Sequence, residues 1–181
     1  MSTLHSTVVE KINASVSQAT LAHFQDTLKI SILTIKVTNG IINELKLKDM
    51  TAIIGISGKF GALIAFSFNA ELANHILDIE TTDLVMSDEE YSDYRLDVIA
   101  ETINIVLGHS TKALSKIGEP VGLTPPIVLE DGGLLRRPRG ALFSSFSYKT
   151  THGLMDIVFI TPSELYGDNL SLVKNSGDIN E

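Results

Sequence analysis

The chain has 181 residues, of which 44% are hydrophobic and 20% are charged, and it contains no cysteine. These values are typical of a single globular domain that can bury a core without a disulfide or a structural metal, and the lack of cysteine also excludes thiolate metal sites and a cysteine nucleophile. The formal net charge of −8 argues against DNA or an anionic membrane as the main partner.

The segments most similar to targeting or membrane sequences do not have the required pattern. Residues 1–16 contain Glu10 and Lys11 and no continuous apolar stretch, so we expect no signal peptide. The most apolar segment, residues 51–68, is interrupted by glycines and by Lys59, which indicates two strands rather than a membrane span. We therefore expect a cytoplasmic protein with no membrane partner.

The first part of the chain predicts a helix followed by three strands. Apolar residues at helical spacing predict an amphipathic helix over residues 5–27. Residues 29–37 alternate and are rich in β-branched side chains, which predicts a strand. Two further strands, over residues 51–57 and 61–68, should form a hairpin through the glycine-bearing turn at residues 58–61.

The second part predicts two more helices and a second hairpin. A short helix around residues 71–77 leads into an acidic connector at residues 78–94. After a long helix, residues 121–133 resemble a loop with some extended character. Residues 141–150 and 153–161 then alternate as two strands.

The ends of the long helix are marked by specific residues. Ser87 and Glu90 have the spacing of a capping box, so the helix should begin near Asp88. Gly118 and Pro120 should end it.

Helices on both sides of hairpins predict an α+β fold, with an antiparallel (mixed) sheet built from hairpins and long helices packed on one face. Gly55, Gly58 and Gly61 match neither a Rossmann nor a Walker loop, and they lie between two strands. We expect one domain over residues 1–165 and a polar tail over residues 166–181.

The long helix carries a polar stripe in apolar surroundings. At about 100° per residue, its core face consists of Leu96, Ile99, Ile103, Val106, Leu107, Leu114 and Ile117. A second stripe consists of Asp97, Glu101, Asn104 and Gly108. Glu101 and Asn104 are neighbours on the helix surface, and Val98 and Ile105 border them on the side where a solvated helix is normally polar. This arrangement suits a docking surface, although an exposed Glu–Asn pair is also common on ordinary helices.

The pair belongs to a longer pattern: Asp97, three residues, Glu101, two residues, Asn104, twenty-one residues, Pro126. The pattern resembles the signature of the CheC/CheX/FliY family of phosphatases, which act on phosphorylated response regulators.

Other features are similar to the same family. The glycine-bearing hairpin at residues 53–68, Gly108 on the helix and the Thr-Pro-Pro sequence at residues 124–126 all have counterparts there. With one Glu–Asn motif instead of two, the chain resembles CheX more than CheC.

The resemblance implies a substrate and a role for each residue. The substrate would be the aspartyl phosphate of a CheY-like receiver domain, which supplies its own Mg²⁺, lysine and hydroxyl, so we expect no cofactor or metal in this chain. Asn104 would hold the attacking water in line, and Glu101 would pair with the receiver's lysine. Pro126 would shape the loop beside the helix, while Asp97 is either polar support on the stripe or a surface acid facing water.

The resemblance to CheX also implies a homodimer, which is physically reasonable because a sheet of few strands leaves an edge to be covered. Ile103 stands where the family often has a small residue, and the helical spacing places it toward the core. The alternative function is a non-catalytic module of the same fold that docks a receiver, a flagellar component or another signalling protein.

The remaining candidate residues indicate no separate site. The five histidines lack metal-site spacing, and His109 is either near the docking surface or an ordinary imidazole. Arg136, Arg137 and Arg139 form a basic cluster that could bind an anion, although a solvated turn before a strand is more common.

Overall fold

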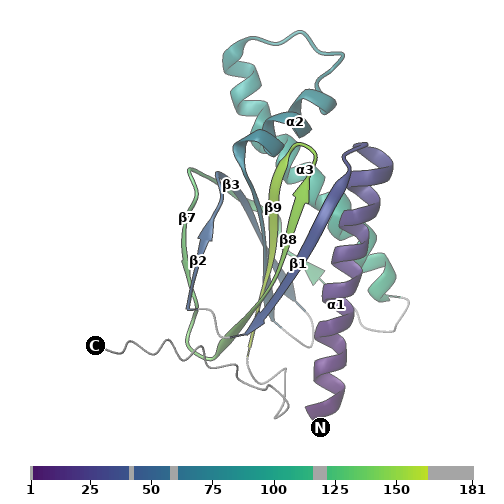
Figure 1. The fold of residues 1–181 in the computed structure, drawn as a ribbon, viewed down its shortest axis with the longest axis vertical. Coiled ribbons are helices and arrows are strands. Elements are labelled where there is room, and N and C mark those ends of the chain that lie inside the picture. Colours follow the sequence, from purple (N-terminus) through teal and green to yellow (C-terminus); the bar gives the residue numbers. More distant parts are fainter. Residues whose placement is uncertain (1, 41–42, 58–60, 116–121, 163–181) are drawn as a thin grey trace.

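The computed structural model describes residues 2–40, 43–57, 61–115 and 122–162. Figure 1 shows their arrangement. The helical elements are α1 (Ser2–Ala22), a π-helical turn η1 (His23–Thr27), α2 (Ala70–Glu80) and α3 (Asp88–Ser115). The strands are β1 (Ile32–Gly40), β2 (Glu44–Leu47), β3 (Met50–Ser57), β4 (Ala62–Phe68), β5 (Gly122–Leu123), β6 (Ile127–Glu130), β7 (Gly133–Arg136), β8 (Ala141–Thr150) and β9 (Gly153–Pro162).

Seven strands form the main sheet, in the order β1-β8-β9-β4-β3-β5, and β6 also pairs with β3. The hairpins β3–β4 and β8–β9 form its centre, where Phe66 of β4 lies opposite Ile157 of β9. All strand pairs of the described residues are antiparallel. The predicted α+β fold is therefore confirmed, and the sheet is antiparallel rather than mixed.

All three α-helices pack on one face of this sheet (Figure 1). Apolar side chains from α1, α2 and α3 form one continuous core with the inward side chains of the central strands. Phe66 and Phe159 of the sheet and Ile103 of α3 are among its fully buried members. This core fixes the position of α3, and with it the direction of the polar stripe.

The opposite face of the main sheet is covered by a smaller sheet, in which β2 pairs with β7 (Figure 1). A second cluster of buried residues lies between the two sheets and consists of Ala65, Ala141, Phe143, Val158 and Ile160. Leu45 of β2 and Leu135 of β7 pack against it. The β2–β7 ribbon thus replaces helices on this face.

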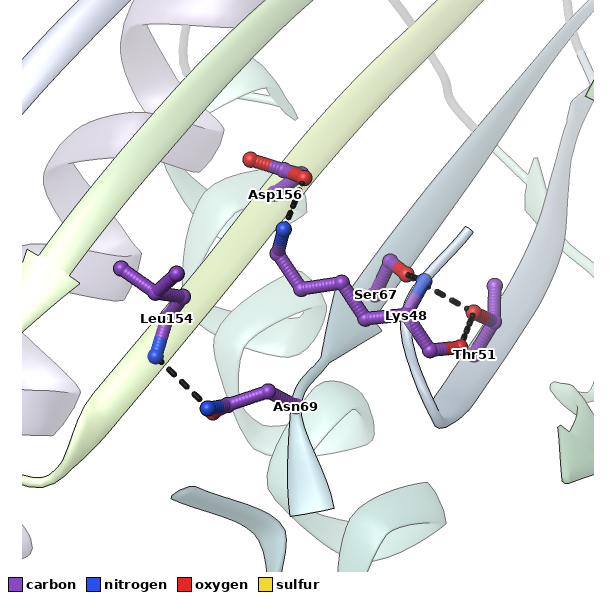
Figure 2. Close-up of polar contacts among 6 residues, drawn as sticks. All are labelled: Lys48, Thr51, Ser67, Asn69, Leu154 and Asp156. Atoms are coloured by element: carbon purple, nitrogen blue, oxygen red, sulfur yellow. Dashed lines mark hydrogen bonds and ion pairs between the residues drawn. The ribbon is translucent and has the colours of Figure 1, made fainter. Parts of the chain in front are cut away.

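Polar contacts hold the turn between β2 and β3 against the main sheet (Figure 2). Lys48 Nζ lies 2.8 Å from Asp156 Oδ2, and the Lys48 backbone N–H donates to Ser67 Oγ at 2.6 Å. The Ser67 and Thr51 hydroxyls are hydrogen bonded at 2.9 Å. Because these contacts join the turn to β3, β4 and β9, we interpret this network as structural.

The start of α2 is held in the same region of the molecule (Figure 2). Asn69 Oδ1 accepts from the backbone N–H of Leu154 at 2.9 Å and from that of Leu72 at 3.2 Å. The second bond is a helix N-cap, so one side chain both begins α2 and joins it to β9.

The predicted helices and the strands of both hairpins are confirmed, with small differences in their bounds. The first helix ends in the π-helical turn, and β1 begins at Ile32 rather than at residue 29. The reason for the second difference is local: Lys29 has a positive φ of 58°, which no strand residue adopts. The acidic connector is shorter than predicted, because α2 continues to Glu80.

The sequence pattern did not predict the short strands. The predicted loop over residues 121–133 contains β5 and β6, and β2 and β7 were not expected at all. The hairpin turn at residues 58–60, the helix end at Gly118 and Pro120, and the tail at 166–181 lie outside the described residues. Among the described helices, none has the length and hydrophobicity needed to cross a membrane.

Candidate functional site

The helix α3 begins at the predicted capping box. The Ser87 backbone N–H donates to Glu90 Oε2 at 2.8 Å, and the Glu90 backbone N–H donates to Ser87 Oγ at 3.3 Å. The hydrogen bond from the Ser87 backbone, together with that from its hydroxyl, lowers the pKa of the Glu90 carboxyl. Tyr91 Oη donates to Asp78 Oδ1 at 2.5 Å, so the first turns of α3 are also tied to α2.

The apolar face of α3 is buried in the main core as expected. Ile99, Ile103, Val106 and Leu107 are fully buried, and Leu96 is partly buried against the same core. Ile103 therefore points away from the polar stripe and does not narrow access to it. The side chain of Leu114 and the residue Ile117 lie outside the described part of the chain.

The polar stripe lies on the surface. Asp97, Glu101, Asn104 and Gly108 are all exposed, and successive members are three or four residues apart, so they follow one side of the helix. Glu101 and Asn104 are thus one turn apart with both polar groups directed to solvent.

An open groove of about 380 Å³ runs along this stripe. Its lining includes Tyr94, Asp97, Glu101 and Asn104 from α3, and Glu80 from the end of α2. The structure therefore brings three of the predicted site residues together in one depression. Gly108 is exposed one turn beyond Asn104 and is not part of the lining.

The predicted apolar border of the stripe requires a correction. Val98 was expected on the solvent side, but it is buried, as is Thr102. The reason is that α2 packs against this side of α3, which the helical spacing of α3 alone does not reveal. Ile105 is half-buried and contributes to the groove.

Pro126 lies in a segment that is fixed beside α3 rather than in the groove itself. Thr124 forms two hydrogen bonds with Gly55 of β3: its N–H donates to Gly55 O at 2.9 Å, and its Oγ1 accepts from Gly55 N–H at 2.8 Å. A Cβ at position 55 would lie 3.0 Å from the Thr124 side chain, so glycine permits this close approach. Arg95 of α3 forms an ion pair with Glu130 of β6, which joins the helix to the strand after Pro126.

Sequence reasoning missed Tyr94 and Glu80 as groove residues. Tyr94 lies three residues before Asp97, so the helical spacing that identified the stripe could have included it. Glu80 could not have been found in this way, because its position depends on how α2 packs against α3.

The described histidines do not form a metal site, and no group of three potential ligands occurs in the described part of the chain. His23 is buried, and burial together with the nearby His109 lowers its pKa. His75 stacks on His152 with ring centroids 3.5 Å apart. The pKa of His75 is lowered, mainly by burial and to a smaller extent by the charge of His152. His109 is exposed on α3 outside the groove lining, and the side chain of His5 is not described.

The basic cluster has mainly structural contacts. Arg136 Nε lies 3.3 Å from Glu44 Oε1, across the β2–β7 pair. Arg137 Nη1 donates to the backbone oxygen of Ala141 at 2.9 Å. Arg139 is exposed and fits the interpretation as a solvated turn before a strand, whereas Arg136 belongs to β7 and Arg137 is half-buried.

The chemistry available in the groove is mainly that of the carboxylates of Glu80, Asp97 and Glu101 and the carboxamide of Asn104. Asn104 can donate and accept hydrogen bonds, and Glu101 and Asp97 can accept them or pair with cations. The carboxylates would repel a free phosphate ion. The groove therefore suits a cationic or hydrogen-bonding group of a partner rather than a free anion.

In a comparison with protein families, residues 50–147 match the model described as "Chemotaxis phosphatase CheX". This segment contains α3 and Pro126. A comparison with curated proteins finds no match.

Several solved structures have a similar fold. A chemotaxis protein CheX from Desulfovibrio desulfuricans aligns with a TM-score of 0.70 at 21% identity, covering 82% of this chain and 97% of that chain. A CheC-like superfamily protein from Shewanella sp. PV-4 aligns with a TM-score of 0.68 at 18% identity, covering 83% and 96%. A chain of the CheX–CheY–BeF₃–Mg²⁺ complex from Borrelia burgdorferi aligns with a TM-score of 0.59 at 19% identity, covering 84% and 96%.

Proposed function

Because the chain belongs to the CheX family of chemotaxis phosphatases, we propose that it hydrolyses the aspartyl phosphate of a CheY-like receiver domain in the cytoplasm. The observation that carries this proposal is the position of Glu101 and Asn104, exposed one helical turn apart along an open groove. The solved complex of a CheX with CheY, BeF₃ and Mg²⁺ supports a receiver as the partner.

In the proposed reaction, a water oxygen attacks phosphorus while the bond between phosphorus and the aspartyl oxygen breaks. The products are inorganic phosphate and the free aspartate of the receiver, and the proton of the water passes to phosphate or solvent. Asn104 holds the water in line by accepting a hydrogen bond from it. An acyl phosphate is already activated, so positioning and charge stabilisation supply most of the remaining acceleration.

Glu101 has a docking role in this proposal. Its carboxylate pairs with the receiver's lysine, and burial at the interface strengthens that charge-assisted contact. The receiver supplies Mg²⁺, so this chain needs no metal or cofactor of its own. The carboxylates of the groove are then compatible with an anionic substrate, because the receiver's lysine and Mg²⁺ accompany the phosphoryl group.

The supporting residues act through position. Asp97 extends the acidic side of the groove by one turn beyond Glu101. Gly108 leaves the helix surface low beyond Asn104, and Pro126 shapes the segment between β5 and β6.

The test measures the decay of a phosphorylated CheY-like receiver with and without the protein. Asn104→Ala should abolish the acceleration, and Glu101→Ala should chiefly raise KM. Asn74→Ala and Glu10→Ala are matched controls, because both residues are exposed on helices outside the groove. Full activity of Asn104→Ala would refute the assignment, and receiver binding by the wild-type protein without faster decay would support the non-catalytic docking function.

The proposal includes a homodimer formed at β1, the open edge of the main sheet. Ile35 and Val37 lie opposite Tyr148 and Phe146, so their side chains are on the helix-covered face, yet they are 41% and 52% exposed. An exposed apolar edge strand favours pairing with another chain.

A further inference from the structure

A second depression adjoins the groove at the start of α3. It measures about 390 Å³, and its lining includes Leu84, Val85 and Met86 from the connector between α2 and α3. Tyr94 and Asp97 line both depressions. The connector and the groove therefore form one continuous surface.

This surface exposes large apolar side chains. Leu84 is 51% exposed, Tyr94 is 41% exposed and Val85 is fully exposed. We call these three residues the connector patch. Contiguous exposed apolar residues beside a groove are typical of protein–protein interaction sites.

The connector patch is held by the ends of two helices. Thr81 N–H donates to Leu77 O at 2.9 Å and Leu84 N–H donates to Thr81 O at 2.9 Å, which continues the end of α2. The capping box of Ser87 and Glu90 fixes the other end. The apolar side chains are thus presented on a defined backbone.

Carboxylates surround the connector patch. Glu80, Asp93, Asp97 and Glu101 line the two depressions, and none of them forms an ion pair with a described residue. A partner surface that fits here would be apolar at its centre and carry lysine or arginine at its border.

The distance along α3 connects this surface with the proposed reaction. Tyr94 and Asn104 are ten residues apart, which corresponds to about 15 Å along the helix axis. A small domain is about 30 Å across, so a receiver whose aspartyl phosphate reaches Asn104 can also cover the connector patch.

We propose that Leu84, Val85 and Tyr94 form the surface by which this protein selects its receiver, whose matching face is apolar and bordered by basic side chains. The inference rests on the proposed function, since the receiver is the occupant of both the groove and the connector patch. It assigns recognition to the connector and chemistry to the middle of α3.

The test uses Leu84→Asp, Val85→Asp and Tyr94→Ala in the full chain, with a CheY-like receiver phosphorylated by acetyl phosphate. Each variant should lower kcat/KM by about tenfold or more, as is typical of interface hot spots, through a higher KM at unchanged kcat. Affinity for the same receiver activated with BeF₃ and Mg²⁺ should fall in parallel. The wild-type KM should rise with salt, because the basic border would be screened.

Leu134→Asp is the matched control, because Leu134 is 53% exposed but lies on β7, on the opposite side of the main sheet from α3 (Figure 1). It should behave as wild type. Connector variants with wild-type KM and affinity, in a protein that Asn104→Ala inactivates, would overturn the recognition proposal alone. A wild-type protein that neither binds the receiver nor accelerates its decay would overturn the proposed function and this inference with it.

Discussion

Gly108 is an unusual residue for the interior of a long helix. Glycine there costs about 1 kcal/mol relative to alanine, because it loses more backbone freedom on folding. A Cβ at position 108 would meet no described atom within 4 Å, so packing within the chain does not require glycine. In the proposed complex, the absence of a side chain at this place on the stripe, one turn beyond Asn104, would leave room for the receiver.

Gly108→Ala should therefore separate stability from function. We expect the free energy of unfolding, measured in urea, to rise by about 1 kcal/mol, while kcat/KM for the phosphorylated receiver falls. Asn74→Ala on α2 is the control, because it also improves helix propensity at an exposed position but should leave turnover unchanged. Unaltered turnover of Gly108→Ala would mean that the receiver does not approach this part of α3.

Residue positions on α3 were largely predictable from spacing alone. The period of 3.6 residues places Glu101 and Asn104 at the surface and Ile103 in the core, because one face of the helix is occupied by the sheet. Val98 shows the limit of this reasoning. Its burial depends on α2, and a helical period says nothing about a second neighbour on another side.

The capping box is the element-scale feature on which the position of both depressions depends. Ser87→Ala removes the hydroxyl that accepts from the Glu90 N–H and donates to its carboxylate. We expect a loss of about 1 kcal/mol in the free energy of unfolding, as is typical of N-caps, measured by urea denaturation. Ser31→Ala, at an exposed position before β1, should have no such effect. Equal stability of Ser87→Ala and wild type would show that the start of α3 is held by its tertiary contacts instead.

Elements with their own local signals were predictable, and elements formed by tertiary pairing were not. The long helix has a cap and a periodic core face, and both hairpins consist of long apolar strands. In contrast, β2 and β7 have four residues each, and their pairing partners are far apart in the sequence. Before β6, Pro125 and Pro126 indicated a loop, although the strand begins directly after them.

At the scale of the whole molecule, the two faces of the main sheet are covered by different structures. Helices cover one face and the β2–β7 ribbon covers the other (Figure 1). The helix-covered face was predicted because the helices are amphipathic. The second cover was missed, since it consists of the short strands just described.

The edges of the same sheet lead to the last prediction. Strand β1 has nine residues and lies at one edge, whereas the opposite edge is formed by the short strands β5 and β6. If two copies pair through β1, Val37→Lys should convert the dimer into a folded monomer, because it places a charge in the new apolar contact. Light scattering after size-exclusion chromatography measures the mass, and circular dichroism checks the fold.

Leu129→Lys on β6 is the control, because Leu129 is an apolar residue that is 42% exposed at the other edge. If Leu129→Lys dissociates the dimer and Val37→Lys does not, the interface is at β6, and a wild-type protein that is monomeric at all concentrations would contradict the dimer itself.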